Sequence, residues 1–257
     1  NDWFEILSEK NEDEFEFIKF PFNDPLYILY SSGTTGKPKC IIHSAGGTLI
    51  QHIKEHRYHC DMQENDRIMY FTTCGWMMWN WMVTALASKV TLVLYEGSPI
   101  FPNPLILFEI AENEKLSFFG ASAKYIDSLN KLKIQPNEKN NYDKLRVFAS
   151  TGSPLAPKSY DWVYSNVKKD LQLSSISGGT DIVACFVHGN PCLPVKRGEI
   201  QCSSLGMDVQ SWDDSGLRIF DLPGELVCIN SFPSIPLGFW NDEDDKKFKE
   251  AYFEKYN

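Results

Sequence analysis

Apolar runs alternate with amphipathic stretches from Pro25 onward, and each has the length of a strand or a helix. The strand-like runs are Leu26–Tyr30, Lys39–His43, Arg67–Thr72, Val90–Tyr95, Leu116–Phe119, Arg146–Ser150 and Leu173–Ser177. The helical stretches are Ala45–His56, Trp76–Ala87, Pro104–Asn113, Ala123–Lys131 and Pro157–Val167. This alternation predicts an α/β fold with a helix-covered, mostly parallel sheet, whose ligands bind at the carboxyl ends of the strands.

The pattern changes after about residue 183, where helical stretches give way to short β-type runs. These runs are Ile182–His188, Glu199–Cys202, Met207–Trp212, Leu217–Phe220 and Glu225–Ile229. Residues 213–216, Asp-Asp-Ser-Gly, have the composition of a hairpin turn. We therefore divide the chain into the end of a preceding element (1–23), an α/β region (24–182) and a smaller, β-rich, antiparallel region with a charged tail (183–257).

Composition narrows the class of protein. The chain has 257 residues, 43% hydrophobic residues and a net charge of −9, which indicates a globular domain with a sizeable core and argues against nucleic-acid binding. No apolar run reaches transmembrane length. The seven cysteines form no C-x-x-C pair, so we expect reduced thiols in a cytosolic protein and no zinc site. The five histidines show no metal-binding spacing, and we expect them at the surface or at helix ends.

The densest polar segment, Tyr30–Lys39, directly follows the first strand-like run, so we expect the 31–38 loop at the carboxyl edge of the parallel sheet. It combines glycines, hydroxyl groups and lysines, which together suit the phosphates of a nucleotide. It is neither a P-loop, because Gly33 and Gly36 are separated by only two residues, nor a dinucleotide fingerprint. Physical reasoning alone also allows an ordinary polar surface loop.

The segment resembles the phosphate-binding motif of the adenylate-forming superfamily, which includes acyl-CoA synthetases and luciferases. The resemblance extends over nearly the whole chain and implies a part of the large N-terminal domain of such an enzyme. It implies that this loop binds ATP through Ser31, Ser32, Gly33, Thr34, Thr35, Gly36, Lys37 and Lys39.

Two further loops resemble nucleotide-binding motifs of this superfamily. In the first, which carries Ser177, Gly178 and Gly179, the resemblance implies that Thr180 contacts phosphate and that Asp181 binds magnesium in place of the usual Glu. The other is Gly152, Ser153 and Pro154, which the resemblance places beside the adenine. Without the resemblance, the first loop is a Gly-Gly turn, and the other is a helix start with Ser153 as N-cap and Pro154 at the first helical position.

A tryptophan- and methionine-rich segment resembles the acyl-substrate pocket of the superfamily, and the resemblance places Trp76 and Met77 in that pocket. Aromatic and Met residues at helical spacing are more often core, which is the interpretation we prefer for Trp81 and Met82. Acetate-activating members carry Trp where this chain has Gly178, so the glycine implies room for a longer acid. The motifs are most similar to those of members that activate acetoacetate.

The resemblance therefore implies an AMP-forming acid–thiol ligase that uses ATP, Mg²⁺ and coenzyme A. Its catalytic groups in this chain are Thr180 and Asp181, and its partners are small molecules rather than nucleic acid or a membrane. The lysine-bearing C-terminal domain of the superfamily has no counterpart in these 257 residues, so we expect the isolated chain to turn over poorly. Two alternatives stay open: a synthetase for another short or medium-chain acid, and a truncated, non-catalytic nucleotide-binding product.

Overall fold

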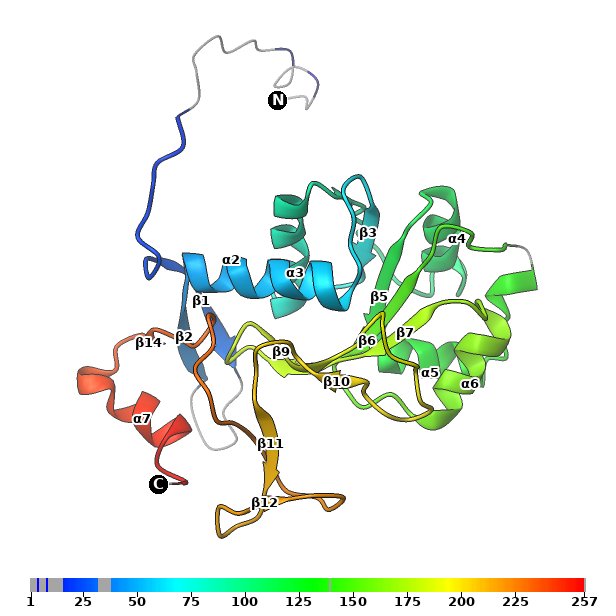
Figure 1. Ribbon diagram of the computed structural model, residues 1–257. Coiled ribbons are helices and arrows are strands. Elements are labelled where there is room, and N and C mark those ends of the chain that lie inside the picture. The colour runs from blue at the N-terminus through cyan, green and yellow to red at the C-terminus, as the bar shows by residue number, and fades with distance from the viewer. Residues whose placement is uncertain (1–3, 5–7, 9–15, 32–37, 139, 257) are drawn as a thin grey trace.

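Five parallel strands form the central sheet in a computed structural model that describes residues 4, 8, 16–31, 38–138 and 140–256 (Figure 1). The spatial order is β4-β3-β5-β6-β7, and every neighbouring pair is parallel. The strands are β3 (Arg67–Tyr70), β4 (Thr91–Leu92), β5 (Phe118–Ser122), β6 (Val147–Thr151) and β7 (Gln172–Ser175). Each falls within or beside one of the predicted apolar runs.

Side-chain alternation along these strands builds a core on each face of the sheet. Phe119 and Phe148 point to one face, where their rings stack 4.8 Å apart within a cluster that includes residues of three helices. These helices are α4 (Ile106–Asn113), α5 (Ala123–Lys131) and α6 (Pro157–Asn166). Phe118 and Val147 point to the other face and pack with Trp81 of α3 (Met77–Thr84). The predicted α/β class, with a helix-covered and mostly parallel sheet, is confirmed.

The first two strands lie outside this sheet. β1 (Pro25–Ser31) pairs antiparallel with β2 (Lys39–Ser44), which pairs antiparallel with β14 (Gly238–Phe239). The predicted position of the 31–38 loop at the carboxyl edge of the parallel sheet is therefore wrong, because the loop joins the strands of a hairpin. Alternating strands and helices do not reveal which strands pair, and a loop this short allows antiparallel pairing of its flanks.

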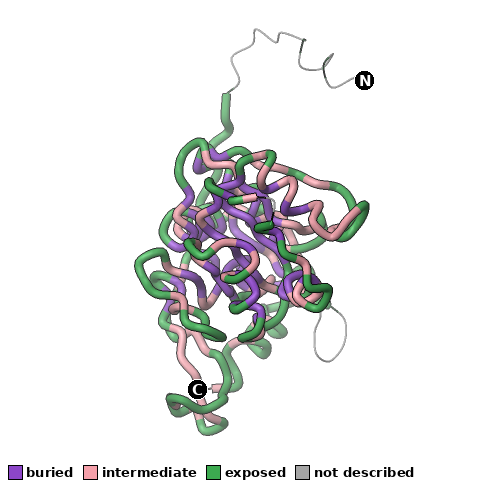
Figure 2. The backbone as a smooth tube through the Cα atoms, turned by 90° about the vertical axis from the view of Figure 1, so that its right-hand side faces the viewer, coloured by how far each residue is buried: buried purple, intermediate pink, exposed green. Residues whose placement is uncertain are grey.

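Two smaller antiparallel sheets follow, as predicted for the C-terminal part. One has the order β10-β9-β8, and the other has the order β12-β11-β13. Their strands are β8 (Ser177–Gly179), β9 (Ala184–His188), β10 (Cys202–Ser203), β11 (Val209–Trp212), β12 (Arg218–Ile219) and β13 (Glu225–Cys228). The predicted turn at 213–216 joins β11 to β12, and Gly216 supplies its left-handed conformation at φ 78°. In Figure 2 the buried residues fill the body of the molecule, while the end that carries the C-terminus is largely exposed.

Helix ends differ from the predicted ones in informative ways. α2 (Ala45–Lys54) continues into a π-helical turn, η1 (Glu55–His59), and α3 ends in a 3₁₀ turn, η2 (Ala85–Ser88). α6 begins at Pro157, as the helical stretch Pro157–Val167 predicts, with Ala156 as its N-cap, so the helix start with Ser153 as N-cap and Pro154 at the first helical position is wrong. Both Pro154 and Pro157 satisfy the rule for the first helical position, and only the later one is used.

The chain ends in η4 (Glu243–Asp245) and α7 (Lys246–Tyr252), and a short 3₁₀ turn, η3 (Pro136–Glu138), lies between α5 and β6. None of the helices in the described part of the chain has the length and apolar character needed to span a bilayer. The proposed division at residues 23 and 182 stays a prediction.

Candidate functional site

Three side chains that are far apart in the sequence meet at Asp181. Lys39 Nζ donates to Asp181 Oδ1 at 2.6 Å, and the Tyr252 hydroxyl donates to the same oxygen at 2.5 Å. Lys39 Nζ also lies 3.4 Å from the Tyr252 hydroxyl and 4.9 Å from the centre of its ring. A carboxylate, an ammonium and a phenol therefore form one hydrogen-bonded cluster, which we call the Asp181 cluster.

Each member of the cluster lies at the end of a secondary-structure element or in a turn between two elements. Lys39 is the first residue of β2, Asp181 lies in the turn between β8 and β9, and Tyr252 is the last residue of α7. At such positions the backbone leaves the regular hydrogen-bonding pattern, and side chains from different elements can converge. The two predicted nucleotide loops, 142 residues apart at Lys39 and Asp181, are thus brought into direct contact.

The electrostatics of the cluster favour an ionised carboxylate. Burial by itself would raise the pKa of Asp181, but the hydrogen bonds from Lys39 and Tyr252 outweigh it, so the pKa lies below its ordinary value. The neighbouring His43 is neutral near pH 7 because burial lowers its pKa to about 4, against smaller opposing effects of Thr180 and Asp181. The Asp181 side chain remains 31% exposed and can therefore meet a ligand.

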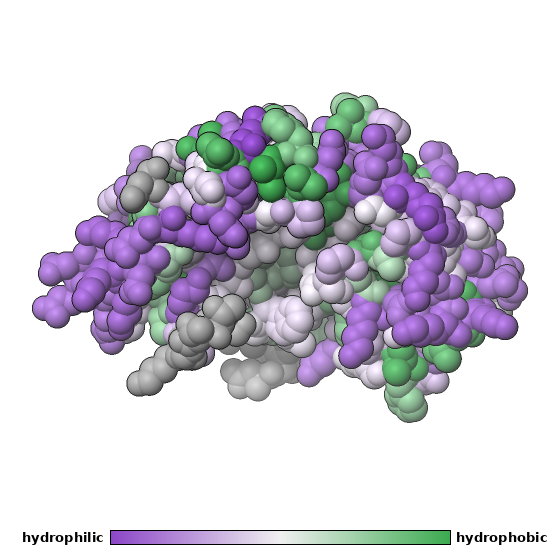
Figure 3. All heavy atoms as spheres, turned by 90° about the horizontal axis from the view of Figure 1, so that it is seen from below, coloured by the Kyte–Doolittle hydropathy of each residue, from purple (hydrophilic) through white to green (hydrophobic). Residues whose placement is uncertain are grey.

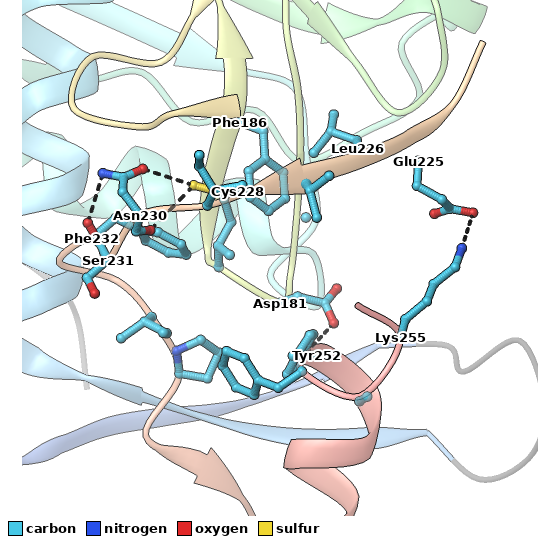
Figure 4. Close-up of a pocket in the computed structure, with 18 of the residues that line it drawn as sticks. Asp181, Phe186, Glu225, Leu226, Cys228, Asn230, Ser231, Phe232, Tyr252 and Lys255 are labelled. Carbon is cyan, nitrogen blue, oxygen red and sulfur yellow. Dashed lines mark hydrogen bonds and ion pairs between the residues drawn. The ribbon is translucent and has the colours of Figure 1, made fainter. Parts of the chain in front are cut away.

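A cavity of about 520 Å³ opens beside the cluster. Figure 4 shows Asp181 and Tyr252 at its wall, with the segment from Glu225 to Phe232 opposite and Lys255 bonded to Glu225. Of the predicted site residues, Gly178, Gly179 and Asp181 line this cavity. Seen from below in Figure 3, hydrophilic side chains dominate both flanks of the molecule, and hydrophobic ones gather at the upper margin with a smaller group at the lower right.

The phosphate loop is anchored at both of its ends. Ser31 pairs with Lys39 in the β1–β2 register, so the hairpin fixes where the loop leaves and re-enters the sheet. The Ser31 hydroxyl is buried and has no hydrogen-bond partner within the described part of the protein. Six predicted phosphate-binding residues lie outside the described residues: Ser32, Gly33, Thr34, Thr35, Gly36 and Lys37.

The predicted adenine loop begins at the carboxyl end of β6. Gly152 adopts φ 90°, a conformation that favours glycine, and Ser153 and Pro154 are exposed. The Thr151 hydroxyl donates to the Ile176 carbonyl at 3.0 Å, immediately before Ser177. Gly152–Pro154 therefore start beside the loop that leads to Thr180 and Asp181, although they do not line the cavity.

The tryptophan-rich segment divides at the start of α3. Trp81 and Met82 are 0% and 1% exposed, which confirms their predicted place in the core. Trp76 is 63% exposed as the N-cap of α3, and Met77 packs partly buried at the edge of the core. Neither lines the 520 Å³ cavity, and their predicted contact with an acyl substrate stays a prediction.

Gly178 is explained by strand packing. A Cβ at this position would lie 1.9 Å from the Ala184 carbonyl oxygen of the paired strand β9, so no side chain fits. The space that we expected the glycine to leave for a longer acid is occupied, in the Cβ direction, by that backbone. Its influence on the choice of acid stays a prediction.

The predicted surface position of the histidines is wrong. His43, His52, His56, His59 and His188 are at most 3% exposed. The burial of three of them is predictable from the sequence, because His52, His56 and His59 recur at helical spacing and so share one face of α2 and η1.

These histidines accompany a buried carboxylate, Glu55, which is 0% exposed. Glu55 accepts from Trp81 Nε1 at 2.9 Å and from the Cys185 backbone N–H at 3.0 Å, and burial raises its pKa. Glu55, Cys185 and His188 place metal-ligand atoms within 4.8 Å of one another. Glu55 is already hydrogen-bonded, and His188 Nδ1 accepts from the Gly189 N–H at 2.8 Å, so packing of core polar groups accounts for this arrangement. We call Glu55, its donors Trp81 and Cys185, and His188 the Glu55 cluster.

Comparison with known proteins gives consistent results. The family described as "AMP-binding enzyme" matches residues 4–232. Acetoacetyl-coenzyme A synthetase of Rhizobium meliloti (strain 1021) is 54% identical over 94% of this chain and 37% of its own length, and acetoacetyl-CoA synthetase of Gallus gallus is 50% identical over 95% and 36%. The solved structure of acetoacetyl-CoA synthetase from Streptomyces lividans superposes with a TM-score of 0.91 at 42% identity, covering 98% of this chain and 39% of that one. The chain thus spans somewhat over a third of the length of these relatives.

Proposed function

Because this chain belongs to the family of AMP-binding enzymes, we propose that it is the nucleotide- and acid-binding part of an acid–thiol ligase that activates acetoacetate. In the proposed reaction, the acetoacetate carboxylate attacks the α-phosphorus of ATP, giving acetoacetyl-adenylate and pyrophosphate. The thiol of coenzyme A then attacks the acyl carbon, giving acetoacetyl-CoA and AMP. The seven free cysteines support a reducing compartment such as the cytosol.

The contact between Lys39 and Asp181 is the observation that carries this proposal. It joins the phosphate loop to the proposed magnesium loop, at a site where the carboxylate is ionised and partly exposed. An anionic acid and an anionic nucleotide can react only when their charges are offset and their positions are fixed. In this pair, the Lys39 ammonium can bind a phosphate and the Asp181 carboxylate can bind a cation.

The donor atoms at the cluster fit Mg²⁺, which prefers hard oxygen ligands and is often held by one or two carboxylates together with substrate phosphates. Asp181 Oδ2 faces Gly179, since a Cβ there would lie 3.3 Å from it, while Oδ1 takes both hydrogen bonds. When bound, the ion would neutralise phosphate charge. Lys39 and Ser31 would hold the phosphates, and Thr180 would orient the α-phosphate.

The choice of acetoacetate over other acids is supported by the names of the relatives, all of which match over most of this chain. Trp76 and Met77, at the start of α3, are the residues that we propose for contact with the acid. A synthetase for another short or medium-chain acid would use the same nucleotide loops, so only substrate comparison separates the two.

Calorimetric titration of this chain with ATP tests the nucleotide part of the proposal. We expect Mg²⁺ to tighten ATP binding, and Asp181→Asn to remove at least tenfold of that gain, because a ligand and a charge are lost together. The matched control is Asp214→Asn, which makes the same change at an exposed carboxylate in the β11–β12 turn. Equal ATP affinity of all three proteins with and without Mg²⁺ would contradict the proposal.

Exchange of pyrophosphate into ATP tests the reaction and the acid. With acetoacetate, acetate and butyrate compared, we expect acetoacetate to support the highest rate. Binding of Mg²⁺-ATP without exchange for any acid would favour the second candidate, a nucleotide-binding product that does not catalyse the reaction.

A further inference from the structure

The two side-chain donors to Asp181 both bind the same carboxylate oxygen. Asp181 Oδ1 receives both the Lys39 ammonium at 2.6 Å and the Tyr252 hydroxyl at 2.5 Å, whereas Oδ2 faces the backbone of Gly179. Two donors on one carboxylate oxygen restrain the short side chain and with it the direction of Oδ2.

The position of Tyr252 is itself determined by packing. Asp242 accepts hydrogen bonds from the backbone N–H groups of Lys247 and Phe248, which fixes the first turn of α7. At the other end of the helix, the Tyr252 ring packs edge-on against Phe239 at 5.6 Å and against Phe248 at 5.3 Å. Phe239 belongs to β14, which pairs with the strand that carries Lys39. One structural unit thus holds both donors to Asp181.

We propose that Tyr252 is a positioning residue for Asp181, and that its hydroxyl holds the carboxylate so that Oδ2 can ligate the magnesium ion of bound Mg²⁺-ATP. This inference rests on the proposed function and adds to it a residue of α7, 71 positions from the carboxylate. Figure 4 shows Tyr252 of α7 directed at Asp181.

The Asp181 carboxylate needs such support because its side chain is short. The superfamily motif that this loop resembles has Glu where this chain has Asp181, and Asp is shorter by one methylene group. A carboxylate on a short stem reaches a metal ion in fewer orientations, so fixing its orientation increases the share of molecules that are ready to bind. Ordering a ligand in advance improves affinity because less entropy is lost on binding.

Tyr252→Phe removes the hydroxyl alone, because the ring that packs on Phe239 and Phe248 and lies under Lys39 is kept. We expect this variant to lose about tenfold of the Mg²⁺-dependent gain in ATP affinity, the effect of a charge-assisted hydrogen bond, with its Mg²⁺-free affinity unchanged. The measurement is calorimetric titration of this chain with ATP, with and without Mg²⁺. Tyr58→Phe, at a 63% exposed tyrosine of η1, is the control for loss of a hydroxyl.

A double-mutant cycle separates positioning from a general structural effect. In an Asp181→Asn background, Tyr252→Phe should cause no further loss of ATP affinity, because the carboxylate that the hydroxyl positions is no longer present. Wild-type affinity in Tyr252→Phe, a loss that is equal without Mg²⁺, or an undiminished loss beside Asp181→Asn would each overturn the positioning role alone. A wild-type chain whose ATP affinity does not respond to Mg²⁺ would overturn the proposed function as well.

Discussion

The Glu55 cluster and the Asp181 cluster each surround one carboxylate with donors, yet they are opposite in character. Glu55 is fully buried and accepts from neutral groups, the Trp81 indole and the Cys185 backbone, and burial raises its pKa. Asp181 is 31% exposed and accepts from a cation and a phenol, and its pKa is lowered. The first arrangement can only stabilise the fold, whereas the second keeps a charged oxygen available to a ligand.

The comparison shows what distinguishes a core polar group from a site. Both clusters join segments that are more than 100 residues apart, so long-range contact alone does not mark function. The useful difference is whether the charge is matched within the protein and whether one acceptor position stays open. The pKa is shifted at both carboxylates, and the exposure of the side chain and the charge of its donors separate the two cases.

The largest expected effect on stability is in the Glu55 cluster, whose carboxylate is fully buried. Glu55→Ala leaves the Trp81 indole N–H and the Cys185 N–H without an acceptor in the core, and we expect it to lower the free energy of unfolding by about 4 kcal/mol. Urea unfolding followed by circular dichroism measures this loss. Glu64→Ala, which removes an exposed partner of Lys89, should change it by less than about 0.5 kcal/mol. A comparable loss from both variants would contradict the proposed importance of the buried hydrogen bonds of Glu55.

The pH dependence of stability sharpens the comparison further. Burial lowers the pKa of His52 to about 4, so the unfolded chain binds its proton more readily than the folded chain does. His52 therefore contributes fully above its unfolded pKa of about 6.5, and this contribution is lost as the pH falls toward 4. Between pH 7 and pH 5 the loss should be about 2 kcal/mol for this histidine alone.

Unfolding in urea at pH 7 and at pH 5 measures this loss of stability. We expect His52→Gln to reduce the difference between the two free energies of unfolding by about 2 kcal/mol. Asp181→Asn, in the Asp181 cluster, is the control. Its carboxylate has a lowered pKa and is already ionised throughout this range, so the variant should keep the wild-type difference. If His52→Gln responded to pH as the wild type does, burial of a neutral ring would not be the cause.

Prediction from the sequence succeeded where the information is local. Apolar runs of strand length located β3, β5, β6 and β7, because a strand that is buried on both faces consists mostly of apolar residues. The pairing of β1 with β2 was not predicted, since pairing depends on partners rather than on the run itself. The π-helical turn after Lys54 was also missed, and with it the inward direction of Glu55 and His59.

The candidate site was predictable only in its loop residues. The motifs around Lys39 and Asp181 stand out by composition and by resemblance, and their contact in the structure is consistent with that prediction. Tyr252 has no such signal: it is one of several aromatic residues in a charged, amphipathic tail. Its place beside Asp181 follows from the packing of α7 on β14, a tertiary contact that no local pattern encodes.

The smallest effect on stability is expected at Trp76, and it extends the comparison to two tryptophans five residues apart. Trp81 belongs to the Glu55 cluster and is 0% exposed, whereas Trp76 is 63% exposed at the start of α3. Trp76→Ala should change the free energy of unfolding by less than about 0.5 kcal/mol, because little surface is buried there. If Trp76 contacts the acid, the variant should weaken binding of acetoacetate in the presence of Mg²⁺-ATP by about tenfold, measured by calorimetry. Trp240→Ala, at a similarly exposed tryptophan, should leave that binding unchanged, and an equal loss from both would remove Trp76 from the proposed acid site.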